Sequence, residues 1–181
     1  GTPRGNNGVK VNRQHNVGFL FRGYTGVCYD HEYMAFMNTE LGDRGNFKCS
    51  NETLNKLQEM TRRSTLGNFQ HFPNDCPHRE KLGFTGDCQV FSSAALYLMD
   101  SYPVLQRWLR EVAAAQYSNG CIPYVVPRKD SKQKTVNSGR DGSAGWCDAF
   151  QIVPYRLMRR TNSILLVREL YPSIKRWIEF Q

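Results

Sequence analysis

Apolar residues recur at helical spacing along most of the chain after residue 48. The first such segment runs from Cys49 to a plausible stop at Gly67. Its apolar residues stand at every third position, with polar residues between them: Leu54, Leu57 and Met60. This spacing predicts an amphipathic helix. Ser50 or Asn51 can cap its start, because a short polar side chain accepts hydrogen bonds from the free backbone N–H groups of the first turn.

Two further helices are predicted between residues 87 and 120. The first starts after Asp87, and its apolar side comprises Val90, Phe91, Ala94, Ala95, Leu98 and Met99. The sequence SYP then breaks the pattern, and Pro103 suits the first turn of the next helix. That helix ends near Gly120, and its apolar residues are Val104, Leu105, Trp108, Leu109 and Val112.

A long irregular connection, residues 121–145, precedes the last two predicted helices. Loops of this length are usually functional or lack fixed structure. The next helix is predicted over 146–160, where Pro154 can introduce a kink. The last one starts near Asn162 and can be split at Pro172. Its apolar residues are Ile164, Leu165, Leu170, Ile174, Trp177 and Ile178.

The first 47 residues differ from the rest of the chain. They are rich in Gly, Asn, Tyr and Phe, and short apolar runs at 17–21 and 32–38 predict strands between turns. Helical hairpins can close into a toroid whose long loops gather at one end, but five helices are too few for a large ring. We therefore expect a β-rich lead, residues 1–47, followed by a mainly α region, residues 48–181, that forms an incomplete (α/α) barrel.

The net charge of +8 does not by itself predict a nucleic-acid partner. Arg and Lys are spread along the chain, and the densest run, RKDSKQK, is interrupted by Asp130 and has no nucleic-acid motif beside it. Solvated surface charge is the default interpretation. No apolar run approaches the roughly 20 residues that a membrane helix needs. Neither nucleic acid nor membrane is predicted as a partner.

The six cysteines show no arrangement typical of a cofactor or metal site. No two of them form a CxxC pair, and no Cys/His group has zinc spacing. They are Cys28, Cys49, Cys76, Cys88, Cys121 and Cys147. We expect mostly buried free thiols, which slightly favours a reducing compartment such as the cytoplasm. No cofactor and no metal are predicted.

The stretch NDCPHREKLGFTGD, between the first two predicted helices, gathers three carboxylates and three basic residues around glycines and a proline. Each of them alone has a structural interpretation. Asp87 can cap the following helix, and Asp75 can fix a turn through its own backbone. Arg79 and Lys81 can be solvated or can pair with Glu80.

Together these residues suit carbohydrate chemistry. Cleavage of an acetal needs a proton on the leaving oxygen, and a carboxylic acid such as Glu80 supplies it at neutral pH only if its pKa is raised. Nearby carboxylates raise that pKa, because like charges resist joint ionisation, and they also accept hydrogen bonds from sugar hydroxyls. Phe84 and Trp146 offer flat apolar faces for a sugar ring. A hard cation is the alternative ligand, but the carboxylates lack calcium-loop spacing.

The longer stretch FPNDCPHREKLGFTGD, residues 72–87, closely resembles the signature loop of the bacterial alpha-L-rhamnosidases, which are inverting glycosidases with a six-hairpin (α/α) barrel. GNFKCSNETLNKL, residues 45–57, resembles the family's entry into the barrel after a β-sandwich. GCIPYVVP, 120–127, and AGWCDAFQIVPY, 144–155, resemble later inner loops and helix starts. The resemblance covers residues 40–180 in order.

This resemblance implies a role for each matched residue. Glu80 stands at the position of the general acid. The positions implied to hold the sugar are Asp75, Arg79 and Asp87, which face the rhamnose hydroxyls, and Phe84, Trp146 and Asp148, which line the pocket. Phe84 stands where the family more often has Trp, so an aromatic wall is kept but an N–H donor is lost.

The resemblance also implies that the second carboxyl group is missing. Inversion needs two carboxyl groups ~6.5–9.5 Å apart, and the family's general base is a Glu on a late helix beyond the matched stretch. Glu169 and Glu179 lie in the last predicted helix but look like residues of an exposed face. We expect an inactive fragment, about the first half of a barrel.

The expected substrate is a glycoside or polysaccharide with terminal alpha-L-rhamnose. Two alternatives stay open: another six-hairpin glycosidase with a different sugar preference, and a carbohydrate-binding module without turnover. The sequence does not predict an oligomeric state or the natural rhamnoside.

Overall fold

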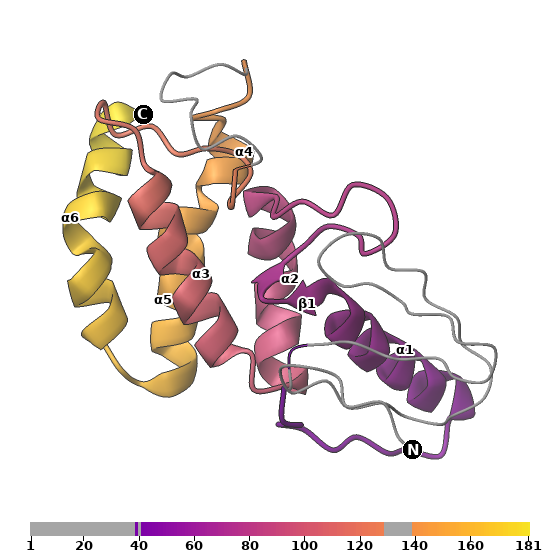
Figure 1. Cartoon of the computed structure of the whole chain (residues 1–181). Helices are drawn as coiled ribbons and strands as arrows, with labels where there is room; N and C mark the ends of the chain where they lie inside the picture. Colours follow the sequence, from indigo (N-terminus) through magenta and orange to yellow (C-terminus); the bar gives the residue numbers. More distant parts are fainter. Residues whose placement is uncertain (1–38, 40, 129–138) are drawn as a thin grey trace, which may run out of the picture.

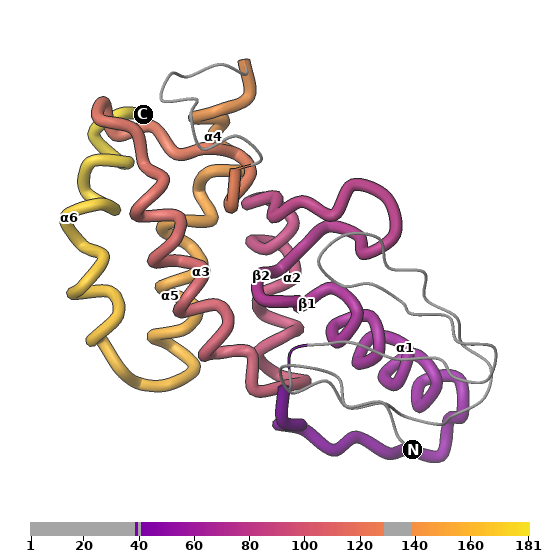
Figure 2. Tube along the Cα trace, in the orientation of Figure 1, coloured from indigo at the N-terminus to yellow at the C-terminus, as the bar shows by residue number. Residues whose placement is uncertain are grey.

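The computed structural model describes residue 39 and residues 41–128 and 139–181. This part of the chain is mainly helical, as predicted. Its elements, in chain order, are α1 (Glu52–Asn68), β1 (Phe69–Gln70), β2 (Phe72–Pro73), α2 (Thr85–Leu98), α3 (Tyr102–Ala115), α4 (Ala144–Cys147), α5 (Ala149–Thr161) and α6 (Leu165–Phe180). Figures 1 and 2 show α3, α5 and α6 side by side, α2 next to them, and α1 on the side of the molecule opposite α6.

The core lies among α2, α3, α5 and α6. The whole predicted apolar stripe of α3 is buried: Val104, Leu105, Trp108, Leu109 and Val112. Trp108 is fully enclosed, and its indole Nε1 donates a hydrogen bond to the backbone oxygen of Val126 at 2.8 Å. Helix α6 contributes Leu166, Leu170, Ile174 and Trp177, and α2 packs most extensively against α5. The Trp108 hydrogen bond also attaches the connection after α3 to this core.

Helix α1 begins as the sequence predicts. Asn51 is its N-cap, and its side-chain oxygen accepts hydrogen bonds from the backbone N–H groups of Thr53 at 2.9 Å and Leu54 at 3.3 Å. Its apolar stripe is not buried: Leu54, Leu57 and Met60 are 46%, 56% and 63% exposed. The predicted amphipathic helix is present, but α1 packs chiefly against the β1 strand, which leaves this apolar stripe in contact with water.

Two predicted helix boundaries differ from the structure. Helix α2 begins before Asp87 and contains it, because the extended residue Phe84 occupies the N-cap position. Helix α3 ends at Ala115 rather than near Gly120. Gly120 instead lies in the following turn with a φ of 92°, a backbone conformation that glycine adopts without strain.

The helix predicted over 146–160 is two helices, α4 and α5, which meet at Asp148. Pro154 lies inside α5 and Pro172 inside α6. Val90, expected on the apolar side of α2, is 80% exposed, so that side of the helix is only partly covered.

The strands predicted at 17–21 and 32–38 lie outside the described residues. Within residues 41–47 the backbone forms an isolated bridge, between Asp43 and Met99. The predicted division of the chain between residues 47 and 48 stays a prediction.

Five of the six cysteines are described, and all five are free thiols. Three of them are buried, in line with the sequence prediction: Cys88, Cys121 and Cys147. None of the helices in the described part of the chain combines the length and apolar character that crossing a membrane requires.

Candidate active site

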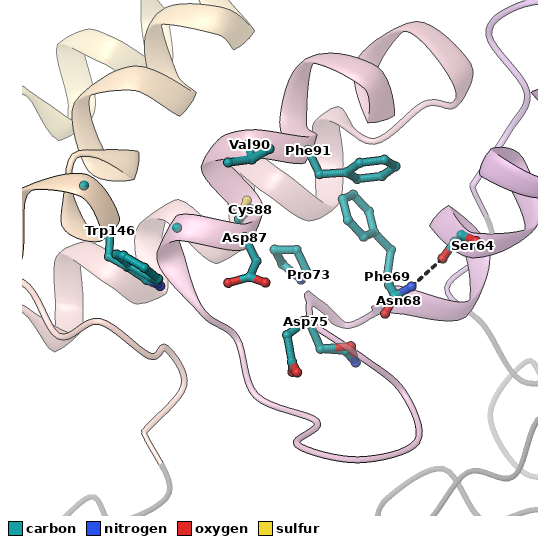
Figure 3. A pocket seen from close by; sticks show the side chains of 13 residues that line it. Ser64, Asn68, Phe69, Pro73, Asp75, Asp87, Cys88, Val90, Phe91 and Trp146 are labelled. Atoms are coloured by element: carbon teal, nitrogen blue, oxygen red, sulfur yellow. Dashed lines mark hydrogen bonds between the residues drawn. The ribbon is translucent and has the colours of Figure 1, made fainter. Parts of the chain in front are cut away.

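A cavity of about 590 Å³ opens where the end of α1, the β1–β2 hairpin and the starts of α2 and α4 meet (Figure 3). It is lined by Ser64, Asn68, Phe69, Pro73, Asn74, Asp75, Gly86, Asp87, Cys88, Val90, Phe91, Gly145 and Trp146. Its volume lies within the range of ordinary small-molecule sites. Two carboxylates and one indole from the sequence prediction are thus brought together in one cavity.

Asp75 closes the loop that follows the hairpin. Its backbone N–H donates to the backbone oxygen of Leu82 at 3.0 Å, and its Oδ1 accepts from the backbone N–H of Leu82 at 3.0 Å. Its Oδ2 accepts from the Cys76 thiol at 2.8 Å. Asp75 therefore has a structural role, but it closes the loop through Leu82 rather than a turn through its own backbone, and it also lines the cavity.

Asp87 is the carboxyl whose acidity the site changes. Desolvation raises the pKa of Asp87, the negative charge of Asp75 raises it further, and Glu80 adds a smaller effect; a hydrogen bond with the residue's own backbone opposes them. The residue as a whole is exposed, yet its carboxyl lies in the cavity, where neighbouring atoms displace part of its water. The N-cap interpretation of Asp87 is wrong, because Phe84 takes that position.

Glu80 and Arg79 lie on the loop that Asp75 closes. Both residues are exposed, and neither lines the cavity. The backbone N–H of Glu80 donates to the Cys76 sulfur at 3.2 Å, which fixes the chain at this point. The sequence argument assigned the effect of carboxylate crowding to Glu80. The structure shows this effect at Asp87, and Glu80 is one of the charges that cause it.

The far end of the loop is fastened to the connection after α3. The backbone N–H of Val126 donates to the oxygen of Gly83 at 2.8 Å, and that of Thr85 donates to the oxygen of Tyr124 at 2.9 Å. A Cβ atom on Gly83 would lie 1.9 Å from the backbone oxygen of Val126, so this approach requires glycine. Phe84 packs on Tyr124, with ring centroids 5.7 Å apart, and does not line the cavity.

Trp146 forms one wall of the cavity. Its ring lies against Gly86, where a Cβ atom would come within 2.7 Å of it, and the residue stays 47% exposed. Asp148 lies outside the cavity lining. Its Oδ1 accepts hydrogen bonds from the side-chain amides of Gln151 at 3.1 Å and Gln181 at 2.8 Å. Only Asp75, Asp87 and Trp146, of the seven predicted site residues, line the cavity.

The sequence profile of the bacterial alpha-L-rhamnosidase six-hairpin glycosidase domain matches residues 42–181. The chain belongs to this family. The predicted resemblance is thereby confirmed, and so is the mainly helical, six-hairpin type of fold.

Curated relatives and solved structures agree with this assignment. An alpha-L-rhamnosidase of Formosa agariphila is 36% identical over 141 residues, which are 77% of this chain and 14% of the relative. The crystal structure of the Streptomyces avermitilis alpha-L-rhamnosidase complexed with L-rhamnose aligns with a TM-score of 0.73 and 32% identity, over 81% of this chain and 14% of that one. The alpha-L-rhamnosidase from Dictyoglumus thermophilum aligns with a TM-score of 0.72 and 26% identity, over 87% and 17%. The chain thus spans about one seventh to one sixth of the length of these rhamnosidases.

Sequence reasoning missed the part of the cavity nearest α1 in this rhamnosidase-family chain. The residues there are Ser64, Asn68, Phe69, Pro73, Asn74 and Phe91. Phe69 and Phe91 meet edge to face, with ring centroids 6.3 Å apart and planes at 83°. The mixture of amides and aromatic residues in GNFQHFPN, residues 67–74, which runs into the start of the signature loop, is the signal that could have found them.

The cavity suits a neutral sugar better than a metal ion. Within residues 39, 41–128 and 139–181, no group of three or more His, Cys, Asp or Glu side chains is placed to hold a cation. Two carboxylates can accept hydrogen bonds from sugar hydroxyls, and the Trp146 ring can cover an apolar sugar face.

Proposed function

We propose that this chain supplies the acid side of the active site of an inverting alpha-L-rhamnosidase, which removes terminal alpha-L-rhamnose from glycosides or polysaccharides. The observation that carries the proposal is the pairing of Asp87, whose pKa is raised, with Asp75 in one cavity of a chain from the rhamnosidase family. A relative with a matching fold was crystallised with L-rhamnose, which supports the choice of sugar.

Glu80 is the proposed general acid. Its loop is fixed at both ends, by Asp75 at one end and by Gly83 at the other. Its charge already reaches Asp87, since it raises the pKa of that residue. Asp87 is the competing candidate, because a carboxyl with a raised pKa holds a proton at higher pH. We assign Asp87 and Asp75 to the sugar hydroxyls.

The remaining sugar contacts are carried over from the family resemblance. Trp146 would cover one face of the rhamnose ring from its place in the cavity wall. Arg79, Phe84 and Asp148 would need a contact outside the present cavity lining, and Asp148 is occupied by two glutamine amides. Trp146 is therefore the best supported of the four, and Asp148 the least.

The general base is proposed to lie outside this chain. Glu169 accepts two hydrogen bonds from Arg110, at 2.6 and 2.8 Å, and Glu179 lies 3.6 Å from the Lys175 ammonium. Neither glutamate lines the cavity. An inverting reaction needs a second carboxyl group on the opposite side of the bond, so the chain alone is expected to be inactive.

Leaving-group dependence in the full-length gene product tests the assignment of Glu80. A general acid matters most when the leaving group is a poor one, because a good leaving group departs without a proton. We expect Glu80→Gln to lower the turnover of alkyl rhamnosides by about 10²–10⁴-fold and that of dinitrophenyl rhamnoside far less. Asp87→Asn should lower both rates alike, since it acts in binding. Glu179→Gln, on the exposed side of α6, is the matched control.

If Asp87→Asn slows alkyl rhamnosides far more than dinitrophenyl rhamnoside, and Glu80→Gln slows both alike, the general acid is Asp87 rather than Glu80. Turnover of another aryl glycoside in place of the rhamnoside would favour a six-hairpin glycosidase of different specificity. Rhamnose binding with no turnover of any glycoside by the full-length protein would favour the carbohydrate-binding module.

A further inference from the structure

We propose that Cys76 is a positioning residue of this site: its thiol couples the loop that carries Glu80 to the carboxylate of Asp75. The inference rests on the proposed function, because it takes Glu80 as the general acid and Asp75 as a contact of the sugar. Cys76 has none of the roles that the family resemblance implies, and it does not line the cavity.

The sulfur of Cys76 makes two hydrogen bonds, one with each of these residues. Its S–H donates to Oδ2 of Asp75 at 2.8 Å, and the sulfur accepts from the backbone N–H of Glu80 at 3.2 Å. A thiol offers one weak donor and one weak acceptor, and both are used here. The main chain of Glu80 is therefore joined to the Asp75 carboxylate by two hydrogen bonds in series.

The rest of the loop is closed by the same short stretch of chain. The backbone N–H of Lys81 donates to the backbone oxygen of Cys76 at 3.2 Å, and Asp75 is joined to Leu82 by the two hydrogen bonds described above. Lys81 has a backbone φ of 58°, a conformation that costs free energy for a residue other than glycine. Hydrogen bonds of residues 75 and 76 thus hold a tight turn that contains Glu80.

The position of the Glu80 main chain depends on this thiol. In the part of the chain that the structure describes, the Cys76 sulfur is the one hydrogen-bond partner shown for Glu80, whose side chain is exposed. The Glu80 Cα is bonded to the nitrogen that the sulfur holds, so this hydrogen bond sets the point from which the carboxyl extends. Acid catalysis is sensitive to such a point, because a displacement of about 1 Å can lower a rate by about 10²-fold.

The Asp75 carboxylate can bind a sugar hydroxyl while it holds the loop. Its Oδ1 accepts from the backbone N–H of Leu82, and its Oδ2 accepts from the Cys76 thiol. A carboxylate has about four acceptor sites, so two further hydrogen bonds can be accepted. A sugar bound at Asp75 would therefore contact the same side chain that the thiol holds, which links sugar binding to the position of the acid.

Leaving-group dependence in the full-length gene product tests the inference. We expect Cys76→Ala to lower kcat for alkyl rhamnosides by about 10–100-fold, because the Glu80 carboxyl is no longer held in place. The kcat for dinitrophenyl rhamnoside should fall by less than about three-fold, since a good leaving group departs without a proton. In a Glu80→Gln background, Cys76→Ala should lower kcat for alkyl rhamnosides no further, because no acid is left to position.

Three further variants separate positioning from an effect on folding. Cys76→Ser keeps a donor and an acceptor in nearly the same place and should turn over alkyl rhamnosides within about three-fold of the wild-type rate. Cys76→Val fills the space of the thiol without its hydrogen bonds and suits the extended backbone that precedes a proline, so it carries the same prediction if Cys76→Ala does not fold. Cys49→Ala is the matched control: Cys49 is also a half-buried free thiol, it lies outside the cavity lining, and its loss should change neither rate.

The outcomes separate this inference from the proposed function. If Glu80→Gln slows alkyl rhamnosides selectively but Cys76→Ala and Cys76→Val do not, the positioning role alone is overturned. Equal losses for both leaving groups, an added loss in the Glu80→Gln background, or a Cys76→Ser variant as slow as Cys76→Ala also overturn it, because Cys76 then only supports the fold. If Glu80→Gln itself slows both substrates alike, the assignment of the general acid is overturned and the positioning role with it.

Discussion

Helices α1 and α3 carry apolar stripes of the same kind, but only the stripe of α3 is covered. Trp108 and Leu105 of α3 are 0% exposed, whereas Leu57 and Met60 of α1 are 56% and 63% exposed. Helix α3 has α5, α6 and the β2 strand as partners, whereas α1 packs chiefly against β1. Periodic spacing thus defines which face of a helix is apolar, and a packing partner decides whether that face is buried.

The largest expected effect contrasts one residue from each stripe. Trp108→Ala should lower the free energy of unfolding by about 3–5 kcal/mol, because it leaves a cavity in the core and frees the backbone oxygen of Val126. Leu57→Ala should change it by no more than about 0.5 kcal/mol, since the side chain is mostly in water. Urea unfolding followed by circular dichroism measures both. A cost above about 2 kcal/mol for Leu57→Ala would show that the α1 stripe is covered in solution.

Spacing and capping rules therefore predicted part of the fold. They found the N-cap Asn51, Pro103 in the first turn of α3 and the complete stripe of α3, since each is a local property of the sequence. They do not tell whether the stripe of α1 or Val90 is covered, because exposure depends on which elements meet in space. A single residue shows the limit well: nothing local distinguishes Val90 from Phe91, yet only Val90 is 80% exposed.

The site was predictable in composition but not in geometry. The signature loop supplied Asp75 and Asp87, the stretch 144–155 supplied Trp146, and all three line one cavity. The electrostatic argument named Glu80, and the raised pKa that the structure gives belongs to Asp87. Its largest cause is desolvation, which no spacing rule gives. Asn68 was missed since it ends a helix and carries no titratable group.

The second prediction compares a glycine from each side of the molecule. A Cβ atom on Gly83 would strike the backbone of Val126, which cannot move without breaking the contact between the signature loop and the packed helices. Gly83→Ala should therefore destabilise by about 1–3 kcal/mol and weaken rhamnose binding. Gly67→Ala, in α1, meets nothing within 4 Å and should stabilise by about 0.5–1 kcal/mol. Thermal unfolding measures the melting temperature of each variant. Equal shifts of the same sign would contradict this prediction.

The third prediction concerns Asp87, which lines the cavity between the end of α1 and the start of α4. Its pKa is raised in the folded chain, so the folded state binds a proton more tightly than the unfolded one. Stability is then lost as the pH rises above the unfolded pKa of about 4, and Asp87→Asn should avoid that loss. The gain at pH 7 should be at most about 1 kcal/mol, because solvent screens a residue that is largely exposed.

A pH series of melting temperatures checks the sign of this effect. The advantage of Asp87→Asn over the wild type should shrink as the pH falls towards 3, where both states of the wild type are protonated. Glu179→Gln, remote from the cavity, should show no such gain at neutral pH. An advantage that grows with acidity would mean that the carboxylate, rather than the acid, is favoured at this position.

The smallest expected effect comes from exposed ion pairs, of which α3 and α1 each form one. Arg110 of α3 holds Glu169 of α6 with two hydrogen bonds, at 2.6 and 2.8 Å, and lowers the pKa of that carboxyl chiefly through them. This contribution is present above the unfolded pKa of about 4.3 and is lost as the pH falls below it. Because the pair is exposed, Arg110→Ala should cost at most about 0.5–1 kcal/mol, and less in high salt.

Helix α1 provides the matched control for this ion pair. Arg62 holds Asp43 with a similar fork, at 2.7 and 3.0 Å, although the apolar stripe of α1 is exposed. We expect Arg62→Ala and Arg110→Ala to have similarly small costs in salt-dependent unfolding experiments. If Arg110→Ala alone cost several kcal/mol, the attachment of α3 to α6 would depend on charge. Equal, small costs leave burial of the apolar stripe as the difference between the two helices.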